Sequence, residues 1–194
     1  MKQAIATLES VSNYSQSKHY DKIEVPKLAD ELDNDYEART WSNRLHVNQD
    51  GNVFIPPMAW KNCLSEAARY KSEKIPGKRN ATFTKHFESG VLVVEPLVLP
   101  IKKEDVPGEW LFVPADGRRG GGSRVMKKFP LIAEWSGVVT FFILDDIITD
   151  QVFEKHLKDA GSFIGIGRFR PSNNGFYGRF RVKQLKWEKD IAEV

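Results

Sequence analysis

The most informative stretch of the sequence for the fold is Ile55-Pro56-Pro57-Met58-Ala59-Trp60-Lys61-Asn62-Cys63-Leu64. The β-branched and aromatic residues at 53–55 predict a short strand. Proline is tolerated at the start of a helix, because its missing N–H would have no partner there. From Trp60 to Ala68, apolar residues recur at the three- and four-residue spacing of one helix face. The stretch therefore predicts a strand that leads directly into an amphipathic helix, which runs to about Lys74.

The segments on either side of this stretch supply the other elements of a small α+β fold. Strands are predicted at 2–11, 91–99, 110–113, 138–144 and 177–185, and a second helix at 149–160. Thr149 can cap this second helix and Gly161 ends it, while residues 77–89 are predicted as a basic loop. The resulting order is β-α-β-β-α-β, the ferredoxin-like (RRM-like) arrangement with an antiparallel sheet.

We expect a single domain over residues 1–194, with two long insertions in its loops. Residues 12–50 are polar and acidic, offer few core candidates and are too long for an ordinary connection. We expect this first insertion to be partly ordered, with a short helix near 29–39. The second insertion, 114–130, contains three consecutive glycines and is flexible by composition.

Composition favours a cytoplasmic protein without a cofactor or a metal. Cys63 is the single cysteine, which excludes an internal disulfide and a cysteine zinc cluster and fits a reducing compartment. No apolar run approaches the roughly 20 residues that span a bilayer, so we expect no membrane contact, and the N-terminus shows no signal-peptide pattern. The four histidines show no metal-binding spacing.

Charge is distributed unevenly along the chain, although the net charge is only +3. Residues 21–37 carry seven acidic residues against two lysines, whereas residues 118–128 and 161–187 carry arginine and lysine without any acid. This pattern fits a solvated surface of uneven charge, or a basic groove combined with an acidic face for a neighbouring subunit.

A second motif lies between the second helix and the last strand: Gly161-Ser162-Phe163-Ile164-Gly165-Ile166-Gly167-Arg168-Phe169-Arg170, followed by Gly175-Phe176-Tyr177-Gly178-Arg179. Glycines such as Gly165 and Gly167 would let the backbone approach a phosphate closely. The arginines supply charge and planar groups, and the aromatic rings are candidates for stacking on unpaired bases. A glycine-rich turn with a solvated basic strand is the alternative interpretation.

Together, the two motifs resemble those of the RAMP superfamily, the ferredoxin-like subunits of CRISPR effector complexes. The first resembles the family pattern Ile-Pro-Gly-Ser-Ser-Leu-Lys-Gly-hydrophobic-Leu-Arg at four positions, Ile55, Pro56, Lys61 and Leu64. The family arginine falls on Ser65, so Arg69, one helical turn later, is the candidate to replace it. The second motif occupies the place of the family's glycine-rich loop. The closest likeness is to the repeating backbone subunit, which carries long loop insertions and packs head to tail along the guide RNA.

The resemblance implies a non-catalytic protein that binds single-stranded RNA or DNA, with copies side by side or with CRISPR-like subunits as partners. Residues expected to contact the strand are basic, aromatic or glycine: Lys61, Arg69, Arg118, Arg119, Arg124, Gly165, Gly167, Arg168, Phe169, Arg170, Phe176, Tyr177 and Arg179. The chain is shorter than most backbone subunits, which also fits a stand-alone relative carried on a phage or another mobile element. Two alternatives remain open. One is a mimic that inserts into or blocks a CRISPR complex, and the other is metal-independent RNA cleavage with His19 or His46 as the general acid–base.

Overall fold

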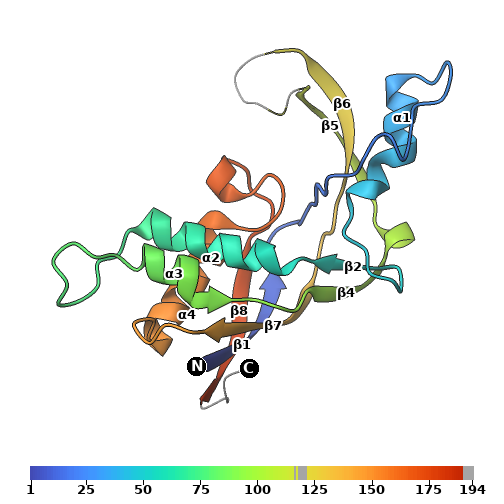
Figure 1. Ribbon diagram of the computed structural model, residues 1–194. Helices are drawn as coiled ribbons and strands as arrows, with labels where there is room; N and C mark the ends of the chain where they lie inside the picture. The colour runs from blue at the N-terminus through green and yellow to red at the C-terminus, as the bar shows by residue number, and fades with distance from the viewer. Residues whose placement is uncertain (116, 118–121, 190–194) are drawn as a thin grey trace.

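The computed structural model describes residues 1–115, 117 and 122–189, and its core is a four-stranded antiparallel sheet (Figure 1). The strand β1 (Lys2–Ser10) pairs on one side with β7 (Ser136–Ile143) and on the other with β8 (Phe180–Lys189). The short strand β3 (Val91–Leu92) extends the sheet beyond β7. The strand order β3-β7-β1-β8 confirms the predicted α+β class and the ferredoxin-like arrangement.

Helices cover one face of this sheet, and alternate residues of β1 (Ala4, Ala6 and Leu8) are fully buried beneath them. The helices of this layer are α2 (Pro57–Lys71), α3 (Thr84–Gly90) and α4 (Asp150–Asp159), and α4 continues into a π-helical turn, η3 (Ala160–Ile164). The helix α1 (Asp33–Thr40) lies outside this layer, and the 3-10 turns are η1 (Trp41–Arg44), η2 (Lys103–Asp105) and η4 (Pro171–Asn173). None of the helices in the described part of the chain is long and apolar enough to cross a membrane.

Two further strand pairs stand apart from the main sheet. They are β2 (Asn52–Ile55) with β4 (Leu97–Lys102), and β5 (Gly108–Pro114) with β6 (Arg124–Pro130). The β5–β6 hairpin projects from the body of the protein, with α1 beside it (Figure 1). Residues 124–130, expected within a flexible insertion, are therefore a strand, because they pair in register with β5 over its whole length.

The structure corrects two details of the helices. The segment 77–89, expected to be a loop, contains all of α3 except its last residue, because Phe83 and Phe87 lie one turn apart and are both buried. Gly161 does not end the second helix, which continues into η3. A Cβ atom on Gly161 would lie within 2.2 Å of the Phe180 carbonyl oxygen, so this glycine serves close packing against β8 and not termination.

The imperfect alternation of apolar residues in the last strand has a structural cause. Leu8 pairs with Val182 and Thr7 with Gln184, which leaves Lys183 as the extra residue of a β-bulge. The bulge moves the inward-facing positions by one residue. Phe180 is therefore buried, and Val182, Leu185 and Trp187 pack against the core with an interrupted period.

Residues 13–15 form a strap, a short extended segment that joins the second motif to the chain that follows the hairpin. The Asn13 carbonyl oxygen accepts a hydrogen bond from the Gly178 N–H at 2.6 Å, and the Ser15 carbonyl oxygen accepts one from the Arg168 N–H at 2.9 Å. Between them, Tyr14 exchanges two backbone hydrogen bonds of 2.8 Å with Ile132. Tyr14 is 2% exposed, so the first insertion contributes to the core more than its composition suggests.

The buried His156 predicts a pH-dependent stability. Its ring stacks on Phe87 with centroids 4.4 Å apart, and its Nδ1 lies 2.8 Å from the Val152 carbonyl oxygen. Burial lowers the pKa of His156 below its ordinary value of 6.5, so at mildly acidic pH the unfolded chain binds a proton that the folded chain does not. The free energy of unfolding should therefore fall as the pH drops through 6.5.

We expect His156→Gln, which keeps a donor for the Val152 carbonyl oxygen, to reduce this fall. Part of it should remain, because burial also lowers the pKa of His46. Denaturant titrations at about pH 7.5 and about pH 5.5 on the wild type and the variant measure the difference. An equal loss of stability in both proteins would contradict the assignment to His156.

Candidate nucleic-acid interface

A basic pocket of about 520 Å³ lies between the β5–β6 hairpin, the first insertion and the second motif. Its cationic side chains are Arg44, Lys127 and Arg168, and its aromatic ones are Phe129 and Phe169. None of the described residues that line it is acidic. The pocket therefore combines positive charge with flat apolar rings, the two properties that bind phosphates and unpaired bases.

Arg168 is held by the strap and by two aromatic rings. Its backbone N–H donates to the Ser15 carbonyl oxygen, and its guanidinium carbon lies 3.2 Å from the ring centroid of Phe129 and 3.9 Å from that of Phe169. Such contacts are cation–π interactions, which are stronger where water is excluded. Burial, together with the nearby charge of Arg44, lowers the pKa of Arg168 to about 10, so the guanidinium is still charged at neutral pH. Its Nη1 atom is buried and has no acceptor among the described residues.

Arg44 is balanced by a carboxylate behind the pocket. Its Nη1 lies 2.7 Å from Glu37 Oε1 and its Nη2 lies 3.1 Å from Glu37 Oε2, a bidentate pair in which both side chains are about one-tenth exposed. Lys128 binds both partners through its backbone, because its carbonyl oxygen accepts from Arg44 and its N–H donates to Glu37. The pair thus fastens α1 and η1 to β6. Within the described residues, Lys127 and Arg168 form no ion pair with a carboxylate, so they supply the unpaired positive charge of the pocket.

The glycines of the second motif pack against the protein itself. A Cβ atom on Gly167 would lie 2.4 Å from the Ser15 carbonyl oxygen and 2.5 Å from the Tyr14 ring, and one on Gly165 would lie 2.7 Å from Pro171 Cδ. Both glycines also have a positive φ, of +74° and +73°. Their observed role is close approach to the strap and to η4, and a contact between these glycines and a phosphate remains a prediction.

The other basic and aromatic residues predicted in the second motif do not line the pocket. The Tyr177 hydroxyl donates to Glu109 at 2.9 Å, and Phe176, which is 64% exposed, meets the Tyr177 ring edge-on at 4.7 Å. The Arg179 guanidinium donates to the carbonyl oxygens of Ser162 and Phe176. Arg170 points the other way and pairs with Glu66 of α2 at 2.9 Å. Arg168 and Phe169 are therefore the predicted residues that line the basic pocket.

The predicted residues of α2 lie apart from this pocket. The Lys61 ammonium donates to the carbonyl oxygens of Phe87 and Glu88 at the end of α3, and burial lowers its pKa. Arg69 pairs with the Glu88 carboxylate at 2.7 Å. Both side chains therefore tie α2 to α3, and their role in binding a strand remains a prediction.

The hairpin presents a second basic and aromatic surface, the hairpin face, made of Trp110, Phe112, Arg124, Met126 and Lys128. Cross-strand pairing places Trp110 opposite Lys128 and Phe112 opposite Met126. The Lys128 ammonium lies 5.8 Å from the Trp110 ring centroid, and the Arg124 guanidinium carbon lies 5.4 Å from that of Phe112. Phe112 is 57% exposed. Arg118 and Arg119, also predicted to bind, lie outside the described residues.

Among the basic and aromatic residues that line the pocket, Arg44, Lys127 and Phe129 were not among the predicted contacts. Lys127 belongs to the basic run 118–128, so composition could have indicated it. Arg44 and Phe129 give no local signal, because only the packing of the first insertion against β6 brings them to the second motif.

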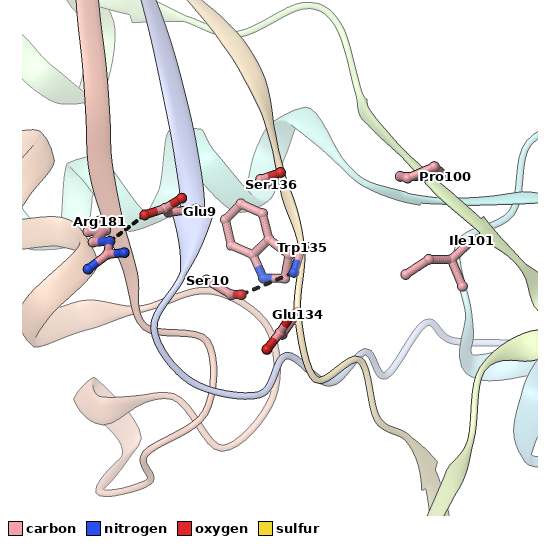
Figure 2. Close-up of a pocket in the computed structure, with 8 residues that line it drawn as sticks. All are labelled: Glu9, Ser10, Pro100, Ile101, Glu134, Trp135, Ser136 and Arg181. Atoms are coloured by element: carbon pink, nitrogen blue, oxygen red, sulfur yellow. Dashed lines mark hydrogen bonds and ion pairs between the residues drawn. The ribbon is translucent and has the colours of Figure 1, made fainter.

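A different cavity, of about 500 Å³, opens beside Trp135 (Figure 2). Its lining includes two carboxylates, Glu9 and Glu134, and its arginine, Arg181, is joined to Glu9. The Trp135 backbone N–H donates to the Ser10 hydroxyl at 3.0 Å. Two carboxylates against one paired cation make this cavity a poor site for the phosphates of a strand.

The two candidate catalytic histidines, His19 and His46, lie in different surroundings in the structure. His19 is exposed and lines a hollow of about 570 Å³ that shares Arg44 and Lys127 with the basic pocket. His46 is half-buried and packs on Phe54 with ring centroids 5.5 Å apart. In the described part of the chain, no group of three or more histidine, cysteine or acidic residues could hold a metal ion.

No family model matches the chain, and no curated protein matches its sequence. Among solved structures, it is similar to Cmr6 from Pyrococcus furiosus, with 15% identity and a TM-score of 0.47, over 94% of this chain and 99% of that chain. It is also similar to a chain described as a CRISPR RNA-guided surveillance complex, with 7% identity and a TM-score of 0.38, over 95% of this chain and 68% of that chain. The predicted resemblance is to subunits of CRISPR complexes, and such a complex is among these neighbours.

The Glu37–Arg44 pair predicts a large stability effect from a conservative change. Glu37→Gln leaves the Arg44 charge buried without a carboxylate, which should lower the free energy of unfolding by about 3 kcal/mol. In the matched control, Asp33→Asn, an exposed pair with Lys27 is removed, so the free energy of unfolding should stay close to that of the wild type. Urea denaturation measures both variants, and equal stabilities would show that the pair does not fasten the insertion.

Proposed function

We propose that this chain binds single-stranded nucleic acid in the basic pocket and along the hairpin face. The observation that carries the proposal is the meeting of Arg44, Lys127 and Arg168 with exposed Phe169 in one concave surface, whose described lining residues include no carboxylate. Lys127 and Arg168 would neutralise phosphates, and Phe169 would offer a ring on which an unpaired base stacks. Arg168 is already held between two rings, so it loses little freedom when it binds.

We propose RNA as the strand, because the two motifs resemble those of subunits that pack along a guide RNA. Copies would bind side by side, since an acidic segment at 21–35 is largely exposed on each copy and basic side chains of β8, Lys183 and Lys186, are exposed as well. Opposite charges on neighbouring copies would favour this contact. The protein would coat the strand without cutting it, because His19 lines a neighbouring hollow and not the basic pocket itself.

The basic pocket predicts which substitutions weaken binding. Arg168→Met keeps a side chain between Phe129 and Phe169 but removes the charge, and Lys127→Met does the same for the second cation. Each should weaken binding of a single-stranded RNA by roughly 5- to 100-fold and reduce the slope of log affinity against log salt by about 1. Fluorescence anisotropy at several salt concentrations measures both quantities.

The matched control is Lys158→Met on α4, whose exposed lysine pairs with Glu154. It removes the same charge from the chain outside the pocket, so affinity and salt slope should stay at wild-type values. If Lys158→Met weakens binding as much as Arg168→Met, only net charge matters and the pocket is not the site.

Strand length provides a test of the assembly. Mass measurements by light scattering should show the number of bound copies rising stepwise as the RNA is lengthened, because each copy covers a fixed number of nucleotides. The same labelled RNA should remain full length on a denaturing gel. Cleavage that appears with the wild type and disappears with His19→Ala would replace the coating proposal with an enzymatic one.

A further inference from the structure

Two aromatic side chains stack on one another at the surface, next to η4. The rings of Tyr70 and Phe163 lie 6.0 Å apart between centroids, at an interplanar angle of 28°. Tyr70 is 65% exposed and Phe163 is 47% exposed. They border a cavity of about 460 Å³ whose floor includes Ile164 and Pro171. We call these two rings the aromatic platform.

The backbone presents this platform through an unusual element. Phe163 belongs to the π-helical turn η3, in which the Gly165 N–H donates to the Ala160 carbonyl oxygen. Within the turn, Ala160, Gly161 and Ile164 are buried, while Phe163 stays at the surface. Single π-helical turns are rare and occur frequently at functional sites. Two adjacent, partly exposed rings that border a cavity form a surface on which a flat group can stack.

The charges around the platform are paired, and so the cavity is close to neutral. Arg170 pairs with Glu66 at 2.9 Å. The Lys71 ammonium lies 5.1 Å from the Phe163 ring centroid and 3.2 Å from Asp159 Oδ2. A cavity of this kind suits an uncharged planar group better than a phosphate, which needs cations free of carboxylates.

The platform is continuous with the basic pocket through η4. Pro171 and Ser172 line the platform cavity, whereas the next residue, Asn173, lines the basic pocket together with Phe169. The two sites therefore adjoin the same three-residue turn. A strand bound in the basic pocket would meet the platform cavity where it passes η4.

We propose that the aromatic platform receives an unpaired base of the strand whose phosphates lie in the basic pocket. The inference rests on the proposed function and adds a second subsite to it, one that binds by stacking and not by charge. Tyr70 supplies the more exposed ring, and Phe163 supports it from behind. A protein partner that offers a flat apolar side chain is the competing occupant, and the experiment separates the two.

The experiment uses a short oligouridine RNA with one central 2-aminopurine, a base whose fluorescence is quenched when it stacks. Uridines stack weakly, so the purine should occupy the platform in preference to its neighbours. Saturating wild-type protein should quench the fluorescence. Tyr70→Ala should restore most of it and weaken binding by roughly tenfold, while Tyr70→Phe, which keeps the ring, should behave like the wild type. Phe163→Leu keeps an apolar side chain without the ring and should restore fluorescence in part.

The outcomes distinguish this inference from the function on which it rests. If the wild type does not bind the RNA, the proposed function fails, and the platform proposal fails with it. If the wild type binds and Arg168→Met weakens binding, but Tyr70→Ala keeps full affinity and quenching, the function stands and the platform proposal is overturned. Circular dichroism melting should give equal stability for Tyr70→Ala and Tyr70→Phe, since both act at an exposed side chain. An unquenched purine in a saturated wild-type complex would also overturn the proposal and leave a protein partner as the occupant.

Discussion

The candidate site depends on the strap at residues 13–15, because its backbone holds the second motif on one side and the chain after the hairpin on the other. Hydrogen bonds from Gly178 and Arg168 end on the carbonyl oxygens of Asn13 and Ser15, and Tyr14 pairs with Ile132 between them. Backbone hydrogen bonds in a buried segment are costly to break, since each freed group would lack water. The position of Arg168 is thus set by main-chain contacts and does not depend on the presence of a ligand.

Much of the fold could be predicted from local periodicity. The spacing of apolar residues after Pro57 predicts α2, and the alternation after Lys2 predicts β1, because both patterns are repeated over several residues. Segments with fewer repeats of a pattern were not predicted correctly. The start of α3 is carried by one pair, Phe83 and Phe87, and β6 follows a glycine run whose composition hides it. Both segments are ordered by neighbours that are distant in the sequence.

Only those residues of the candidate site that lie together in one segment of the sequence could be predicted. Arg168 and Phe169 stand out because charge, glycine and aromatic residues coincide in the second motif. Arg44 reaches the pocket through its pairing with Glu37 and the packing of η1 on β6, which no short window of sequence reveals. The close packing of Gly167 on the Ser15 carbonyl oxygen could not be predicted from the sequence, because a missing side chain allows close approach equally to a phosphate or to the protein's own backbone.

The bulge at Lys183 bears on how copies of this protein can meet. β8 lies at an edge of the sheet, and an open edge can recruit a strand from another molecule and grow into a fibre. A displaced residue interrupts the regular ladder that such growth requires, and the exposed lysines at 183 and 186 repel an identical edge. The edge strand is thereby protected from pairing with strands of other molecules, which limits aggregation through the sheet.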